Sequence, residues 1–189
     1  MRVAVRWGLA CITLSVCQVL SAEEPPAAAP SPRAAEAIQL LGSRDSYQQE
    51  LGFLRLEALR EPATVEVVRR YLTNRDPDTR AYSVRALAAI QGVKAAPSLL
   101  GQLKTEKHPR VRRALLLGLE PFALADSAVL PALIESLRDH DTQVRMTAVD
   151  IVSRVDHPRA REAILVRYKR EGRRDVRRIL EQAMKRIGG

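Results

Sequence analysis

The chain has 189 residues, with 31 Lys and Arg against 22 Asp and Glu, two cysteines, and aromatic residues at only 4%. This length suffices for one domain with a buried core. Both cysteines, Cys11 and Cys17, lie near the start of the chain, so the remainder cannot hold a disulfide framework. The few aromatic side chains argue against a protein that stacks nucleic-acid bases.

Residues 1–22 have the pattern of a secretory signal peptide. Two arginines precede an apolar run over residues 7–20, and two small residues follow it. The run is shorter than the roughly 20 residues that a membrane-spanning helix needs. We therefore expect export to the periplasm or cell envelope, with an uncleaved anchor as an alternative. Residues 14–17 also resemble a lipoprotein cleavage box, so lipidation of Cys17 is a second route to the membrane.

Residues 23–43 are expected to connect this segment to the folded domain. The stretch from Ala22 to Arg33 is dominated by Pro and Ala and has no apolar period, which is typical of a semi-extended linker. A short leading helix between Ala34 and Gly42 is left open. No part of residues 23–43 is counted in the repeat domain.

From residue 44 onward the sequence repeats. Four repeat arginines follow one another at spacings of 32, 33 and 32 residues: Arg80, Arg112, Arg145 and Arg177. The positions three, six, seven and ten after each arginine are nearly all apolar or small, which places them on one face of a helix. Gln48 begins a degraded first copy, as is usual for a terminal repeat. A second apolar cluster, such as Leu99, Leu100 and Leu103, marks a second helix in each unit.

The pattern predicts an all-α fold, because the alternating runs typical of strands are absent. One helix pair cannot bury its own apolar face, so the pairs must stack. We predict a right-handed α-solenoid of stacked antiparallel helix pairs, about four pairs plus a C-terminal capping helix from Arg174 to Ile187. Pro121 should end its helix near Leu119. The approximate units are 44–75, 76–107, 108–139, 140–171 and 172–189.

The stretch from Asp141 to Ala148, DTQVRMTA, resembles the short bacterial HEAT-like repeat that is also found in phycobilin lyases. The resemblance covers the chain from about Gln48 to its end. It implies that the four repeat arginines form a ladder between repeats with aspartates of the turns. The expected partners are Asp76, Asp78, Asp139, Asp141 and Asp175.

No catalytic or metal-binding constellation is visible, and we expect no cofactor. The three histidines, His108, His140 and His157, are interpreted as capping or turn residues, because nothing else converges on them to complete a metal site. No nucleophile motif or Gly-rich phosphate loop is present.

Basic residues are concentrated at the end of the chain, where Arg154 to Gly189 hold 12 basic and 5 acidic residues. Four readings stay open: a solvated cap of the solenoid, an acidic protein partner, an anionic lipid or envelope polymer, and nucleic acid. The candidate partner-binding residues are Arg69, Arg70, Lys104, Arg138, Arg167, Lys169, Arg170, Arg173, Arg174 and Arg178.

Taken together, these features favour an exported monomeric scaffold that binds a protein partner, acidic in one reading, and has no catalytic activity of its own. Two alternatives remain. One is a subunit of an enzyme resembling chromophore lyases. The other is a polyanion or nucleic-acid binder that uses the basic C-terminal repeats, although the lack of aromatic stacking platforms counts against nucleic acid.

Overall fold

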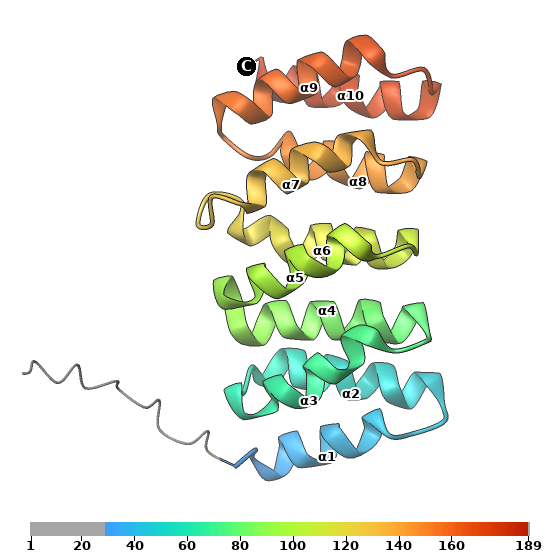
Figure 1. Cartoon of the computed structure of the whole chain (residues 1–189), viewed down its shortest axis with the longest axis vertical. Helices are drawn as coiled ribbons and strands as arrows, with labels where there is room; N and C mark the ends of the chain where they lie inside the picture. Colours follow the sequence, from blue (N-terminus) through green and yellow to red (C-terminus); the bar gives the residue numbers. More distant parts are fainter. Residues whose placement is uncertain (1–28, 189) are drawn as a thin grey trace, which may run out of the picture.

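Helices make up the folded part of the chain, and the computed structural model describes residues 29–188 (Figure 1). Within this range no strand is present. The α-helices are α1 (Pro32–Leu41), α2 (Ser46–Leu59), α3 (Val65–Arg70), α4 (Pro77–Gln91), α5 (Ala96–Thr105), α6 (Pro109–Leu119), α7 (Val129–Glu135), α8 (Thr142–Val152), α9 (Pro158–Arg170) and α10 (Arg174–Ile187). Short 3₁₀ turns flank several of them: η1 (Pro62–Thr64), η2 (Tyr71–Thr73), η3 (Gly92–Ala95), η4 (Glu120–Phe122) and η5 (Ser136–Arg138).

The helices stack in two rows, which confirms the predicted α-solenoid. The even row, α2, α4, α6, α8 and α10, packs helix against helix along the length of the molecule. The odd row, α1, α3, α5, α7 and α9, covers the even row, and its members contact one another less closely (Figure 1). Each unit therefore adds one helix to each row, and distant parts of the sequence meet only through neighbouring units.

Local sequence explains where the helices begin and end. Asp76 caps α4 by accepting the backbone N–H of Thr79 at 2.9 Å, and proline follows it at the first helical position. Gly92 ends α4 with a positive φ of 57°, a conformation that glycine adopts at little cost. Helix α6 ends at Leu119, as predicted from Pro121.

The apolar positions that follow each repeat arginine form the core. In the third unit Leu115, Gly118 and Leu119 are buried. Gly118 lets α6 approach α4, because a Cβ at this position would already lie 3.4 Å from side-chain atoms of Ala88 and Val84. Small residues in the even row thus set the close spacing between its helices.

Helix α1 belongs to the stack, although the sequence alone assigned residues 23–43 to a linker with a leading helix left open. Its residues Ala34, Ala37 and Leu41 are at most 1% exposed. Gly52 of α2 makes this packing possible, since a Cβ there would stand 2.8 Å from both the Ala37 carbonyl oxygen and a Leu41 methyl group. The folded domain therefore begins before residue 44.

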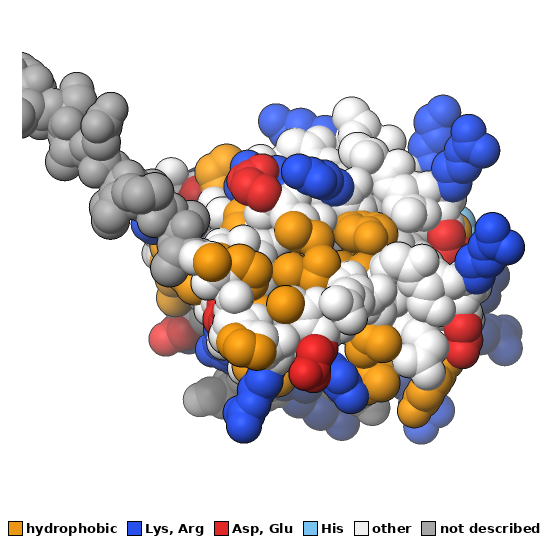
Figure 2. Space-filling view, turned by 90° about the horizontal axis from the view of Figure 1, so that it is seen from below, with side chains coloured by type: hydrophobic (Ala, Val, Ile, Leu, Met, Phe, Trp, Pro, Cys, Tyr) orange, Lys and Arg blue, Asp and Glu red, His pale blue; other side chains and the backbone are white. Residues whose placement is uncertain are grey.

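The two ends of the solenoid differ in chemistry. Ile38 and Leu40 of α1 are only half-buried, and Figure 2 shows apolar side chains gathered on this end of the molecule. At the other end, α10 exposes charged residues such as Arg174, Arg178 and Lys185.

Within residues 29–188, no helix is long and apolar enough to cross a membrane. The predicted signal peptide over residues 1–22, and Cys17 in it, lie outside the described residues.

Candidate binding surface

Arg112 shows how one side chain joins two turns of the solenoid. Its Nε and Nη2 atoms donate to the two carboxylate oxygens of Asp139, each at 2.8 Å. Its Nη1 atom donates to the backbone carbonyl of Lys107 at 2.6 Å. Lys107 lies in the turn before α6 and Asp139 in the turn before α8, so the guanidinium bridges consecutive turns with strong, charge-assisted bonds.

The same arrangement occurs in the units before and after. Arg80 binds the carboxylate of Glu106 at 2.8 and 3.0 Å and the carbonyl of Asn74 at 2.8 Å. Arg145 binds Glu171 at 3.1 Å and the carbonyl of Asp139 at 2.9 Å. We call Arg80, Arg112 and Arg145 the ladder arginines, and Glu106, Asp139 and Glu171 the ladder carboxylates.

Each ladder carboxylate also fastens the turn in which it stands. Glu106 accepts the backbone N–H of His108 at 2.8 Å, Asp139 that of Asp141 at 2.8 Å, and Glu171 that of Arg173 at 3.0 Å. The ladder therefore fixes the backbone at the start of α6, α8 and α10 as well as the contact between units.

These contacts change the acidity of the ladder carboxylates. Burial by itself would raise the pKa of Asp139. The bonds from the Arg112 guanidinium and the Asp141 amide outweigh burial and hold its pKa below the usual value. The pKa values of Glu106 and Glu171 are lowered for the same reason, with the arginines again opposing burial. All three carboxylates thus favour the ionised form in the folded protein.

Of the aspartates expected as ladder partners, Asp139 is the one that the structure places there. Asp76 and Asp141 are instead the N-caps of α4 and α8, and Asp141 accepts the backbone N–H of Gln143 at 2.9 Å. Their carboxylates bind free amides at a helix start.

The expectation was also wrong for Asp78 and Asp175. Asp78 forms an exposed ion pair with Arg110 at 2.9 Å. Asp175 pairs with Arg173 at 2.9 Å, and this hydrogen-bonded contact lowers the pKa of Asp175 to about 2. Both pairs lie at the surface, where an ion pair contributes little to stability.

Arg177 departs from the other repeat arginines. Its guanidinium carbon lies 5.2 Å from the centre of the Tyr168 ring, a cation–π arrangement. Helix α10 is the last helix in the described part of the chain, and no further turn follows it there to supply a carboxylate.

The sequence reasoning missed Glu106 and Glu171. A signal for them exists: Asn74, Glu106, Asp139 and Glu171 follow one another at spacings of 32, 33 and 32 residues, the same as the repeat arginines. Asn74 holds the corresponding turn of the first unit, where its side chain accepts the backbone N–H of Asp76 at 2.9 Å.

On the even row, many charged side chains are already paired between neighbouring helices. Arg154 contacts Glu120 at 2.6 Å, and Arg113 donates to the hydroxyl of Thr147 at 3.1 Å. Further pairs join α2 to α4 and α4 to α6: Arg85 with Glu57 at 3.0 Å, and Arg110 with Asp78 at 2.9 Å. These contacts leave fewer unpaired charges on this row for a partner.

The odd row is different, because a groove runs between each pair of successive helices from α3 onward. The groove between α3 and α5 has a volume of about 550 Å³, that between α5 and α7 about 470 Å³, and that between α7 and α9 about 320 Å³. Repeat proteins bind their partners on extended surfaces along the stack, and successive grooves on one row provide such a surface.

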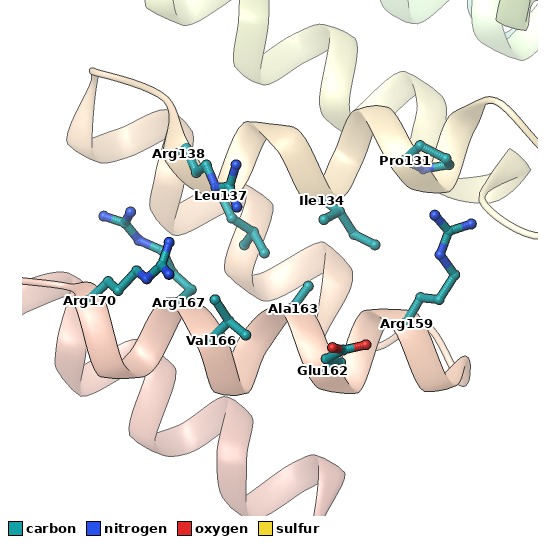
Figure 3. A pocket seen from close by; sticks show the side chains of 10 residues that line it. All are labelled: Pro131, Ile134, Leu137, Arg138, Arg159, Glu162, Ala163, Val166, Arg167 and Arg170. Atoms are coloured by element: carbon teal, nitrogen blue, oxygen red, sulfur yellow. The ribbon is translucent and has the colours of Figure 1, made fainter.

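The structure brings some of the candidate partner-binding residues together and separates others. Arg138, Arg167 and Arg170 line the groove between α7 and α9 (Figure 3). Arg69 and Lys104 line the grooves before it. The remaining candidates lie outside these grooves: Arg70 and Lys169 are exposed on α3 and α9, Arg173 stands in the last turn, and Arg174 and Arg178 are exposed on α10.

The histidines take up turn positions. The Nδ1 atom of His157 accepts the backbone N–H of Arg159 at 3.1 Å and so caps α9. His140 lies 3.1 Å from the Nη2 atom of Arg112, and His108 is the N-cap residue of α6 without a side-chain bond. Within the described residues no three histidine, cysteine or acidic side chains are grouped to hold a metal ion.

A two-row stack of helix pairs, joined by a ladder and grooved along one row, defines an α-solenoid repeat protein. A family model for HEAT repeats matches residues 33–120 and 106–185. The chain therefore belongs to the HEAT-repeat family, and the matched range includes α1 from its second residue onward.

Solved structures show the same fold. The chain is similar to one chain in the structure of the complex of CpcE and CpcF of phycocyanin lyase from Nostoc sp. PCC7120, with 24% identity, a TM-score of 0.63, and coverage of 79% of this chain and 96% of that one. It is also similar to an engineered protein, with 20% identity, a TM-score of 0.54, and coverage of 82% and 78%. A search of the curated proteins gives no match.

Proposed function

We propose that this chain is an exported HEAT-repeat scaffold that binds a protein partner through the grooves of its odd row and catalyses no reaction itself. The observation that carries the proposal is the contrast between the two rows. From α2 to α8, many charges on the even row are paired between helices, whereas the odd row presents successive grooves whose linings include exposed Arg and Lys side chains. The ladder supports this role, because a scaffold whose turns are tied together loses little conformational entropy on binding.

Export is part of the proposal and rests on the sequence of residues 1–22. Fusing residues 1–28 to a reporter enzyme that is active only outside the cytoplasm tests it. We expect activity from this fusion and none from a matched fusion in which two residues of the apolar run are replaced by Arg. Equal activity of the two fusions would refute export.

Partner binding is tested by crosslinking the purified chain in envelope fractions and recovering the crosslinked proteins. We expect one or a few specific partners, displaced by excess unlabelled chain, and a monomer in sedimentation of the chain alone. Recovery of the same proteins with an unrelated HEAT-repeat protein of equal charge would contradict a specific scaffold.

A second candidate is a subunit of a lyase-like enzyme. It is favoured by the likeness to one chain in the structure of the complex of CpcE and CpcF of phycocyanin lyase, a match that covers 96% of that chain. This candidate predicts that the chain binds a linear tetrapyrrole. A shifted visible absorbance spectrum of the pigment on mixing would support it, and an unchanged spectrum would oppose it.

A further inference from the structure

The groove between α7 and α9 combines an apolar floor with a cationic rim. Its floor is formed by Ile134 and Leu137 on one side and by Ala163 and Val166 on the other. Figure 3 shows these side chains pointing toward one another across the groove, with arginines at both of its ends. An occupant must therefore bury apolar atoms in the middle and present anionic groups outward.

Helix α9 has mostly charged side chains at its surface. Two of its apolar side chains are exposed as well, Leu165 at 41% and Val166 at 37%. Val166 faces the groove. Together with Ile134 on the opposite side, Val166 provides the apolar surface at the centre of the groove.

The charge of the rim is unbalanced. Four arginines line the groove, Arg138, Arg159, Arg167 and Arg170, against the single carboxylate of Glu162. Arg167 is held by Glu171, and Arg138 has only a long contact of 3.9 Å with Glu135. In the described residues no ion pair is found for Arg159 or Arg170, whose guanidinium groups remain available to an anionic ligand.

The neighbouring groove between α5 and α7 lacks this imbalance. Its lining holds Lys104, Arg112 and Arg138, but also Glu135 and Asp139, and Arg112 is already bound to Asp139. Among the grooves between odd helices, the one beside α9 therefore has the largest excess of cationic groups over carboxylates within the described part of the chain.

The dimensions suit an extended peptide. Arg159 and Arg170 stand at opposite ends of the groove and are 11 helical positions apart, which corresponds to about 16 Å along α9 at 1.5 Å per residue. An extended chain covers that length with about five residues. Guanidinium groups pair bidentately with carboxylates, and the lining offers no aromatic ring on which a nucleic-acid base could stack.

We propose that the α7–α9 groove binds an acidic segment of the partner protein. An aliphatic or aromatic side chain of that segment packs on Val166 and Ile134, while carboxylates about five residues apart pair with Arg159 at one end and with Arg138 and Arg170 at the other. The proposal rests on the proposed function, because it names the chemistry by which the scaffold recognises its partner.

Fluorescence anisotropy with a labelled probe peptide tests the proposal. The probe is Glu-Glu-Asp-Leu-Phe-Asp-Glu-Glu, and the protein is the purified chain at an ionic strength of about 0.15 M. We expect saturable binding that weakens about tenfold or more when the central Leu-Phe is replaced by Ser-Ser, and no binding of a peptide with Lys at every acidic position. Equal binding of the Leu-Phe and Ser-Ser peptides, or no binding of the probe, would overturn the proposal.

Two charge-matched double variants locate the site. R138E/R170E alters the groove rim, whereas R174E/R178E makes the same change in charge on exposed α10 residues outside the groove. We expect about a tenfold loss of probe affinity for the first variant and less than about a threefold loss for the second. Equal losses would show attraction by the basic end as a whole and would refute the groove.

A third measurement covers the case in which a variant does not fold. A photoreactive group in place of the central Phe of the probe should label α7 or α9 of the unaltered chain, and labelling elsewhere contradicts the proposal. A single-stranded DNA of equal charge serves as competitor, and its displacement of the probe at lower concentration than unlabelled peptide would assign the surface to nucleic acid.

The outcomes separate this inference from the proposed function. If the unaltered chain captures a specific partner and R138E/R170E captures it equally well, the groove assignment fails and the scaffold stands. If the unaltered chain captures no specific partner, the scaffold itself fails.

Discussion

Replacing Arg112 by Met is the most direct test of the ladder. Arg112 is 5% exposed, and Met fills most of its apolar stem without a charge. The change removes both bonds to Asp139 and the bond to the Lys107 carbonyl. It leaves a carboxylate that is 11% exposed with the Asp141 amide as its main remaining donor.

The cost follows from that uncompensated charge. Removing one partner of a buried ion pair costs about 3–5 kcal/mol. Because Asp139 keeps one backbone donor and some solvent contact, we expect the lower end, about 3 kcal/mol. For a domain of this size the melting temperature should fall by roughly 6–12 °C.

Thermal unfolding followed by circular dichroism measures the effect, and Arg113→Met is the matched control. Arg113 is the next residue of α6, is exposed, and makes a single bond to Thr147, so its replacement should cost about 0.5 kcal/mol or less. The double change R112M/D139L should cost less than R112M alone, because no buried charge is then left unpaired. Equal melting of R112M and R113M, or additive losses in the double change, would refute the ladder as a source of stability.

Three further predictions concern stability. Because folding lowers the pKa values of the ladder carboxylates, their contribution to the free energy of unfolding is complete above about pH 4.5, the ordinary value for Glu. This contribution is lost as the pH falls through the lowered values. Urea midpoints measured from pH 7 to pH 3 should fall accordingly, and should fall less for Asp139→Asn. Removing residues 172–189 takes away α10, whose Val176, Leu180 and Ala183 are buried. The free energy of unfolding should fall by several kcal/mol. Unchanged urea unfolding would show that α10 is not part of the cooperative stack. Gly52→Ala should destabilise the fold by about 1–3 kcal/mol, because the added Cβ would collide with α1. The control is Gly101→Ala in α5, whose Cβ would meet nothing within 4 Å and which should be neutral or stabilising by up to about 1 kcal/mol. The reverse order of melting temperatures would contradict the packing of α1.

The repeat could be predicted from the sequence because its signals are local. An apolar stripe at helical spacing after each repeat arginine identifies a helix wherever it occurs, and Pro121 stops α6 at Leu119 through its own missing N–H. Stacking then follows, since no helix pair can bury its stripe alone.

Helix α1 is harder to recognise from sequence. Its ten residues, PRAAEAIQLL, carry no repeat arginine and follow a Pro- and Ala-rich stretch. A helix this short is marginal in isolation, so its membership in the fold depends on packing against Gly52 of α2.

The sequence by itself determined the helices, because each apolar stripe lies within a few helical turns. It also determined their period, because the stripe and its arginine recur every 32 or 33 residues. Only the tertiary structure decided which carboxylate each arginine binds, since the partner lies 26 or 27 residues later, in the turn that precedes the next helix of the even row. Aspartates closer in the sequence are occupied as helix caps. The same holds for the candidate site: Arg138 and Arg170 belong to different units, and they line one groove only because α7 and α9 lie next to each other in the odd row.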